Sequence, residues 1–131
     1  MSIPRIISRA APSAGAATVD FSGNWKNQLG STMTLIVNGQ KLSGTYQSTV
    51  SGGGGTIRGD LVGFVDGDLI AFTVNWTSPA SLTSWTGQLV NENGRDVIKT
   101  LWLLVQNIPD ANEPTGLWQS TFTGSDLFER V

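Results

Sequence analysis

Hydroxyl and tryptophan side chains are the residues of this chain whose types and spacing could form a functional site. The 131 residues include 13 Ser, 14 Thr and five Trp, but only one Tyr and neither Cys nor His. Without Cys and His, the sequence excludes a thiolate nucleophile, a Cys/His zinc site and a histidine acid or base. The chemistry left to the hydroxyls is hydrogen bonding beside aromatic surfaces.

The charge of the chain excludes further classes of partner. Eight Lys and Arg against ten Asp and Glu give a net charge of −2, and only 14% of the residues are charged. Such a weakly acidic chain lacks the basic surface that nucleic acid or an anionic membrane requires. No stretch approaches the ~20 apolar residues of a membrane span. We therefore expect no nucleic-acid partner and no membrane association.

Turn signals recur at short intervals from Phe21 onward and divide the chain into segments rich in Val, Ile, Leu, Thr, Phe and Trp. They include Asn38-Gly39, Asp66-Gly67-Asp68 and Asn91–Gly94. Such dipeptides between apolar segments predict an all-β fold of successive antiparallel hairpins. The strands are expected near residues 22–27, 31–37, 41–50, 56–65, 69–77, 82–91, 96–106 and 117–123. Eight such strands fit a sandwich or an up-and-down barrel, and the short connections favour the barrel, because closure removes exposed strand edges.

The first 20 residues are expected to lie outside the barrel, which spans residues 21–131 as a single domain. Residues 1–20 contain two Pro and several small residues but no sustained apolar period, which predicts a flexible tail. A secretory signal needs an apolar core of about 7–15 residues, and Ile6-Ile7 is too short. Because Ala14–Ala16 is similar to a cleavage site, a remnant of a targeting segment is the alternative.

Alternation along the expected strands places hydroxyls and aromatic side chains on the same faces. A packed core would prefer Leu, Val and Ile, since an unpaired buried hydroxyl costs about 1–3 kcal/mol. A ligand cavity at the end of a barrel explains both residue types. The alternative is that the Trp are core residues and the hydroxyls bond to backbone, and parity leaves both open. The shared faces are Tyr46, Ser48 and Val50; Phe72, Val74 and Trp76; Ser81, Thr83 and Trp85; and Ile98, Thr100, Trp102 and Leu104.

The other face of the seventh strand is also largely apolar, with Val97, Lys99, Leu101, Leu103 and Val105 in alternation. The outer face of a barrel is normally polar unless something covers it. The pattern therefore favours a subunit interface, with an isolated apolar strip on a monomer as the alternative.

Seven short segments resemble the avidin and streptavidin family in their order and spacing. Each segment is weak alone, but seven in register over about residues 21–131 make the resemblance specific. They are Gly23–Thr32, Leu42–Tyr46, Phe72–Trp76, Trp85–Gln88, Thr100–Leu104, Trp118–Thr121 and Gly124–Phe128. The resemblance implies an avidin-like eight-stranded antiparallel barrel that binds biotin with high affinity and without covalent chemistry. It implies no enzymatic activity and no catalytic cofactor, with biotin as the ligand.

The resemblance also implies how the ureido ring of biotin is held. Asn27, Ser31 and Tyr46 match the three donors to the ureido oxygen, and Ser48 and Asp126 match the acceptors of its two N–H groups. Three converging donors can stabilise negative charge on that oxygen. An ionised Asp126 polarises the urea from the far side, which makes the hydrogen bonds cooperative.

Other residues match family positions that contact the thiophane ring and the valerate tail of biotin. Thr83 matches the hydroxyl that faces the thiophane sulfur, while Ser81 and the backbone N–H of Gly52 match contacts to the valerate carboxylate. Trp118 matches a lid tryptophan that closes the site of a neighbouring subunit. The apolar walls implied by the resemblance are Val50, Trp76, Trp85, Trp102 and Leu104, and Trp25 and Phe72 match core at the closed end.

Self-association into dimers or tetramers is implied as well, with biotin and biotinylated molecules as the other partners. The interface residues expected are Leu101, Leu103, Trp118, Thr123 and Ser125. Thr123 and Ser125 are polar where avidin has branched apolar residues, so we expect association that depends on concentration. By family resemblance the protein is expected to be secreted or periplasmic, although no clear signal peptide is visible.

Two other classes of function remain as alternatives. A degenerate avidin-like barrel could bind another small apolar ligand, but such a pocket has no use for five polar groups directed at a urea. An enzyme would need a general acid or base in the cavity. Asp126 is the one carboxylate expected there, and the sequence offers no titrating partner for it.

Overall fold

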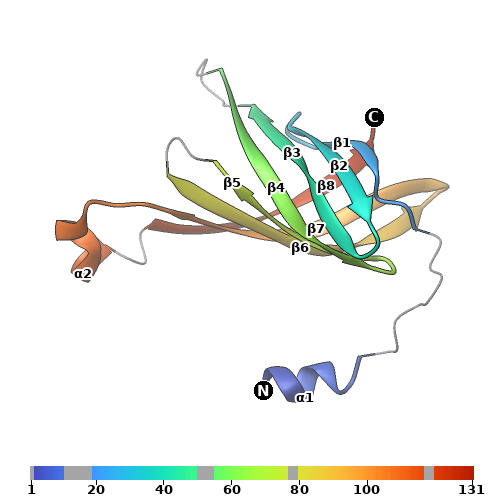
Figure 1. Ribbon diagram of the computed structural model, residues 1–131, viewed down its shortest axis with the longest axis horizontal. Coiled ribbons are helices and arrows are strands. Elements are labelled where there is room, and N and C mark those ends of the chain that lie inside the picture. The colour runs from blue at the N-terminus through green and yellow to red at the C-terminus, as the bar shows by residue number, and fades with distance from the viewer. Residues whose placement is uncertain (1, 11–18, 50–54, 77–79, 117–119) are drawn as a thin grey trace.

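Strands form most of the chain in the computed structural model, which describes residues 2–10, 19–49, 55–76, 80–116 and 120–131. Within these ranges, three short helical segments lie outside the strands (Figure 1): α1 (Ile3–Ile7), η1 (Asp110–Asn112) and α2 (Glu113–Gly116). The strands are β1 (Gly23–Asn27), β2 (Thr32–Asn38), β3 (Lys41–Thr49), β4 (Thr56–Asp66), β5 (Leu69–Asn75), β6 (Ser81–Glu92), β7 (Arg95–Gln106) and β8 (Thr121–Arg130).

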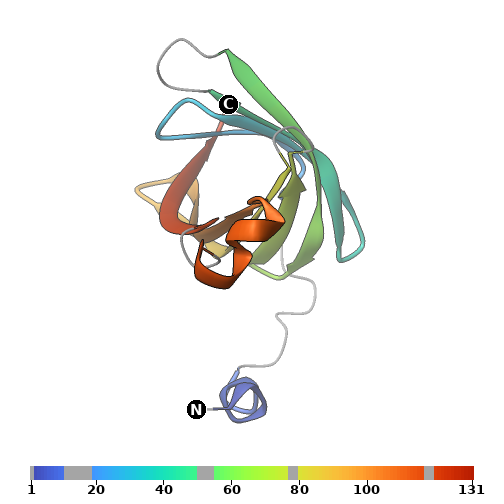
Figure 2. The same cartoon turned by 90° about the vertical axis from the view of Figure 1, so that its left-hand side faces the viewer.

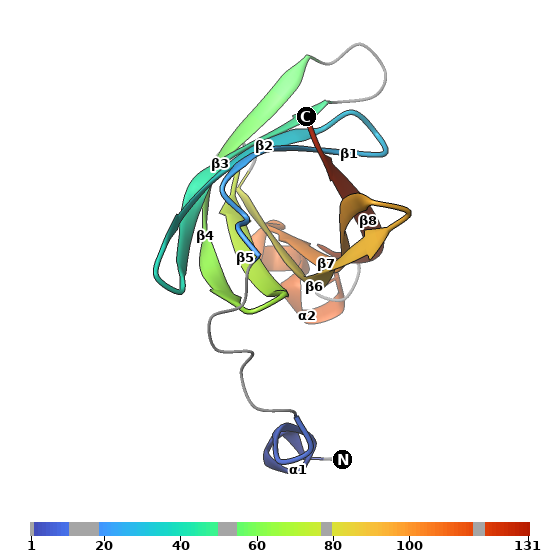
Figure 3. The ribbon, with the colours of Figure 1, turned by 90° about the vertical axis from the view of Figure 1, so that its right-hand side faces the viewer.

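Each strand pairs antiparallel with the next, and β8 pairs with β1 to close the sheet on itself. Figures 2 and 3 look along the resulting ring from its two ends. The closing seam is short, with Trp25 opposite Arg130 and Asn27 opposite Phe128. This topology confirms the predicted eight-stranded up-and-down barrel and excludes the sandwich.

The tight turns follow from local sequence, since three hairpins are joined by two residues each. The β2–β3, β4–β5 and β6–β7 connections contain Gly39, Gly67 and Asn93-Gly94, all with positive φ. Glycine and asparagine adopt this left-handed region at the lowest cost. All three turns lie at the same end of the barrel, called the closed end below, and the pocket lies at the other end.

The predicted bounds of the last strand are wrong. The sequence predicts a strand at residues 117–123, whereas β8 spans Thr121–Arg130. Gly124-Ser125 has the composition of a turn, but pairing with β7 on one side and β1 on the other keeps the segment extended. Closure of the barrel therefore overrides local preference. In the N-terminal segment, where the sequence predicts a flexible tail, the structure has the short exposed helix α1 with Pro4 in its first turn.

Inward-facing aromatic and aliphatic side chains fill the closed end. Trp25 is 0% exposed, its indole N–H donates to the Phe21 carbonyl at 2.9 Å, and the Arg130 guanidinium lies 4.3 Å from its ring centroid. The surrounding core residues are Phe21, Met33, Leu35, Leu42, Val65, Ile70 and Phe128. The same strands continue to the pocket end, so packing at the closed end also holds the pocket residues in place.

Replacing Trp25 tests how far the closed end supports the barrel. We expect Trp25→Phe to lower the free energy of unfolding by about 1–3 kcal/mol, because it removes a buried hydrogen bond and part of a buried ring. Chemical denaturation of the ligand-free protein measures this, with Lys26→Ala as the control at an exposed position of the same strand. An unchanged midpoint for Trp25→Phe contradicts the assignment.

Candidate ligand-binding site

A pocket of about 210 Å³ lies inside the barrel at the end opposite the tight turns. This volume is below the range of about 300–1,000 Å³ typical for drug-sized ligands, so the space suits a smaller molecule. Apolar rings and polar groups line it together. The lining residues are Asn27, Leu29, Ser31, Tyr46, Ser48, Trp76, Thr83, Trp85, Trp102, Leu104, Ser125 and Asp126.

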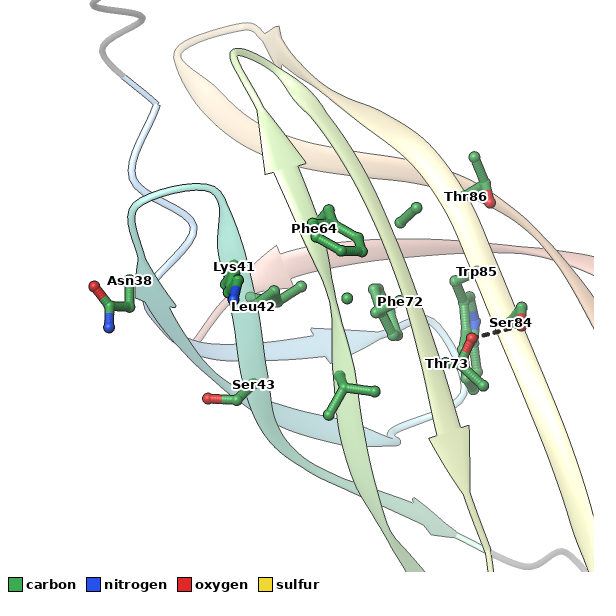
Figure 4. A pocket seen from close by; sticks show the side chains of 13 residues that line it. Asn38, Lys41, Leu42, Ser43, Phe64, Phe72, Thr73, Ser84, Trp85 and Thr86 are labelled. Atoms are coloured by element: carbon green, nitrogen blue, oxygen red, sulfur yellow. Dashed lines mark hydrogen bonds between the residues drawn. The ribbon is translucent and has the colours of Figure 1, made fainter.

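A larger hollow of about 740 Å³ lies on the outer surface of β3–β6 (Figure 4). Phe64 is exposed beside it, and Thr73 and Ser84 hydrogen-bond to each other at 2.8 Å across two of its strands. The polar side chains that line this hollow lie on the exposed outer face of the sheet, as Ser43, Ser84 and Thr86 do. The smaller inner pocket is therefore the candidate site, because it combines burial, aromatic walls and converging polar side chains.

Asn27 ends β1 and at the same time directs an amide into the pocket. Its Oδ1 accepts hydrogen bonds from the backbone N–H groups of Leu29 at 3.0 Å and Ser31 at 2.9 Å. These bonds fix the orientation of the amide. Its Nδ2 therefore points into the barrel, where it donates to the Tyr46 hydroxyl at 3.4 Å.

Tyr46 lies at the centre of an aromatic cluster below the pocket. Its ring stacks on Trp85 at a centroid distance of 4.7 Å and meets the edge of Trp76 at 5.5 Å. Phe72 stacks on Trp85 at 5.1 Å. Such contacts add about 0.5–1.5 kcal/mol each beyond area burial. The cluster therefore fixes the floor and one wall of the pocket.

Asp126 is a buried carboxylate whose two oxygens have different partners. It is 6% exposed; Oδ2 accepts from the Trp85 indole N–H at 2.8 Å, and Oδ1 accepts from the Gln28 amide at 2.9 Å. Gln28 also accepts from the Leu127 backbone N–H at 2.9 Å. The β1–β2 turn thus holds β8 on both sides of Asp126, and the carboxylate is oriented before any ligand arrives.

Thr83 has a fixed orientation through Trp76. The Trp76 indole N–H donates to Thr83 Oγ1 at 2.9 Å, and both side chains are buried. Because Oγ1 accepts this bond, the hydroxyl hydrogen of Thr83 points away from Trp76. Ser31 and Ser48 are in contact more loosely, with 3.5 Å between their hydroxyl oxygens.

The inward hydroxyls have two kinds of hydrogen-bond partner, backbone and side chain. Thr100 bonds to backbone, since its Oγ1 donates to the Asp126 carbonyl at 3.1 Å, as a core hydroxyl would. Thr83 and Ser48 instead contact other side chains at the pocket. Phe72 and Trp25 are fully packed, as expected for core residues.

Most of the predicted site residues lie together around this pocket, but some do not. Ser81 begins β6 outside the lining set, where its carbonyl accepts from the Trp76 backbone N–H at 3.1 Å. Val50, Gly52 and Trp118 lie outside the described residues. Sequence reasoning missed Gln28 and Leu29, and the position of Gln28 directly after Asn27 in the turn was the available signal.

Burial and charge act together on the one tyrosine. Its environment raises the pKa of Tyr46 well above the ordinary value, first through burial and then through the negative charge of Asp126. The phenol therefore remains a hydrogen-bond donor at all physiological pH values.

Among the described residues, no group of three or more Asp or Glu side chains is placed to hold a metal ion, and no helix is long and apolar enough to cross a membrane.

A closed barrel with a polar and aromatic pocket at one end defines the class of small ligand-holding β-barrels. Within that class, the model of the avidin family matches residues 15–131, and the chain belongs to this family.

Individual relatives agree with this assignment. The chain is 35% identical to avidin-related protein 4/5 of Gallus gallus and 32% identical to avidin of the same species, each over 92% of this chain and 84% of the relative. It is 44% identical to afifavidin of Afifella pfennigii over 84% of this chain and 69% of that protein. The crystal structure of xenavidin superposes with a TM-score of 0.73 at 31% identity, over 86% of this chain and 98% of that chain.

The raised pKa of Tyr46 can be measured directly, because it is the one tyrosine in the sequence. We expect little phenolate absorbance from the folded protein one pH unit above the ordinary tyrosine pKa of about 10, and full ionisation in denaturant. The free energy of unfolding should fall as the pH rises above about 10, because only the unfolded chain then loses the proton.

Asp126→Asn is the matched variant for this titration. It removes the charge and keeps the shape, so the pKa of Tyr46 should fall only part of the way, since burial remains. Titration of the folded wild-type tyrosine at its ordinary pKa would refute the buried environment.

Proposed function

We propose that the pocket binds biotin without covalent chemistry, by holding its ureido ring between hydrogen-bond donors and acceptors. The observation that carries this proposal is that the polar groups of Asn27, Ser31, Tyr46, Ser48 and Asp126 line one small pocket together. Biotin is the ligand to which avidin-family membership points. A generic apolar ligand would form no hydrogen bonds with these polar groups, whereas a urea supplies one acceptor and two N–H donors for them.

The distances among the site groups support this assignment. Bonds that position the site groups are short, at 2.8–2.9 Å for Asp126 with Trp85 and Gln28. Contacts among the groups that would face the urea are long, at 3.4 Å for Asn27 with Tyr46 and 3.5 Å for Ser31 with Ser48. Long hydrogen bonds are weak, so a ligand can replace them at little cost.

Charge distribution explains how the urea would be held. The amide of Asn27 and the hydroxyls of Ser31 and Tyr46 donate to the ureido oxygen, where negative charge accumulates. The carboxylate of Asp126 and the hydroxyl of Ser48 accept the two ureido N–H groups. Because donors and acceptors act on opposite ends of one conjugated group, each strengthens the others.

The rest of biotin would occupy the apolar part of the pocket. Trp76, Trp85, Trp102 and Leu104 supply walls for the bicyclic ring. The Thr83 hydroxyl, already accepting from Trp76, can direct its hydrogen to the thiophane sulfur. Ser81, at the start of β6, is assigned to the valerate carboxylate together with Gly52.

The proposed activity involves binding alone. Asp126 is the carboxylate that lines the pocket among the described residues, and hydrogen bonds to Trp85 and Gln28 hold both of its oxygens. A general base must be able to reach and accept a proton from its substrate. Asp126 instead acts as a fixed acceptor, and no catalytic cofactor is proposed.

Biotin titration tests the function. Wild-type protein should bind biotin with a change in tryptophan fluorescence, and Asp126→Ala should weaken binding at least ~100-fold, since it removes a charged acceptor. Asp60→Ala, at an exposed carboxylate on β4, is the control and should bind as wild type does. A ring-opened biotin analogue should bind weakly to all three proteins. Absence of biotin binding by the wild type defeats the proposal.

We further propose that subunits associate through the outer face of β7 and β8. Leu101 is 71% exposed and Leu103 is 57% exposed, and they form an apolar strip on that face. Burying apolar surface contributes about 25 cal/mol per Å². Thr123 and Ser125 are polar neighbours on β8, so the contact should be weak. Trp118 is assigned as the lid that one subunit lends to another.

Light scattering over a range of concentrations tests the association. We expect wild-type mass to rise with concentration and Leu101→Lys to remain closer to the monomer, because a buried unpaired charge opposes association. Thr45→Lys places the same charge on the outer face of β3 and is the control. A monomer at every wild-type concentration refutes the interface.

A further inference from the structure

Gly124 lies on the inner face of β8, directly opposite Trp102 of β7. Its backbone does not adopt the left-handed region that favours glycine, unlike Gly39 or Gly94 in the turns. Any residue could adopt its φ. The need for glycine at this position must therefore come from space rather than from backbone conformation.

The space beside Gly124 is filled by the Trp102 indole. A Cβ atom at Gly124 would lie 2.6 Å from Trp102 Cε2 and 3.0 Å from Nε1, and closer still to Cζ2. Carbon atoms in contact are normally about 3.5–4.0 Å apart. The indole thus lies against the bare backbone of β8, a position open to it only because residue 124 has no side chain.

Trp102 also has a neighbour on its other side. In the register of the sheet it lies between Gly124 on β8 and Trp85 on β6, and both tryptophans line the pocket. A ring that cannot rest on β8 must move away from that strand, toward Trp85 and the space between them. The position of the indole therefore sets the width of the pocket.

We propose that Gly124 is a specificity-determining residue that makes room for a second ring fused to a cyclic urea. It acts through Trp102 as a positioning residue, and the ligand part of the proposal rests on the proposed function. With the indole resting on β8, the pocket accepts a bicyclic urea. With a side chain at Gly124, the ureido groups stay in place but the apolar space narrows.

Gly63 and Gly87, two other strand glycines, differ from Gly124 in what surrounds them. A Cβ at Gly63 would meet the Ala71 carbonyl oxygen and Phe72 Cα, and a Cβ at Gly87 would meet the Lys99 carbonyl and Thr100 Cα. Those obstacles are backbone atoms of a paired strand, so a substitution there would separate strands. At Gly124 the nearest obstacles belong to a side chain, which can turn. A substitution there should alter the pocket more than the fold.

Comparing the binding of two ligands of different size distinguishes an effect on the width of the pocket from an effect on the hydrogen bonds to the urea. We expect Gly124→Ala to weaken biotin binding at least about tenfold, because overpacking of a filled space is strongly unfavourable. Binding of 2-imidazolidone, a cyclic urea without the second ring, should change by less than about twofold. Calorimetry or competition with a labelled ligand measures both. Equal losses for the two ligands, or no loss for biotin, overturn the proposal.

A double-mutant cycle tests whether the effect passes through the indole. In a Trp102→Leu background the obstacle is gone, so adding Gly124→Ala should change biotin affinity by less than about twofold. Additive losses would show that the glycine acts through the backbone and would overturn the proposal. Failure of Gly124→Ala to fold in both backgrounds would overturn it as well.

The position of the Trp102 indole can be tested without any ligand, and therefore independently of biotin binding. In protein labelled with 5-fluorotryptophan, the ¹⁹F resonance missing from Trp102→Leu identifies Trp102. We expect Gly124→Ala to shift this resonance and to leave that of Trp25, at the closed end, unchanged. An unshifted Trp102 resonance overturns the steric argument. A shifted resonance in a protein that fails to bind biotin refutes the proposed function while the placement of Trp102 by Gly124 stands.

Discussion

A carboxylate inside the barrel imposes the constraint on which the rest of the pocket depends. Transfer of such a group out of water costs several kcal/mol unless donors replace the lost hydration. For Asp126 the donors come from two distant parts of the chain, the Trp85 indole on β6 and the Gln28 amide in the β1–β2 turn. The Trp85 ring, held in this way, is the surface on which Tyr46 and Phe72 stack. The same constraint ties the turn that follows Asn27 to the last strand.

Folding therefore orients the site groups before a ligand binds. Each has a partner that fixes its direction: backbone N–H groups for Asn27, an indole for Thr83, and an indole and an amide for Asp126. Binding to fixed groups avoids much of the entropy that ordering side chains would otherwise cost. Packing around Trp25 at the closed end holds the strands in register.

The parts of this protein that could be predicted from sequence are those set by local periodicity. Alternation placed Thr83 and Trp85 on the inner face, and Asn38-Gly39 marked a hairpin, because both signals depend on a few neighbouring residues. The bounds of β8 could not be predicted, since its pairing with β1 joins residues about a hundred positions apart. Gln28 was missed for the same reason, as its partners Asp126 and Leu127 are distant in sequence. The functional assignment of site residues came from the resemblance and not from periodicity.

Both chain ends of the barrel lie at the end away from the pocket. Arg130 binds the carbonyls of Asp20 and Ser22, and the Val131 backbone N–H donates to the Asn24 carbonyl at 3.1 Å. A polypeptide joined before Asp20 or after Val131 would leave the barrel on this side, while the tail of a bound ligand would leave from the mouth. A covalent fusion and a non-covalently bound ligand would therefore extend from opposite ends of the barrel. A surface or enzyme attached to either chain end would leave the mouth accessible to a tethered ligand.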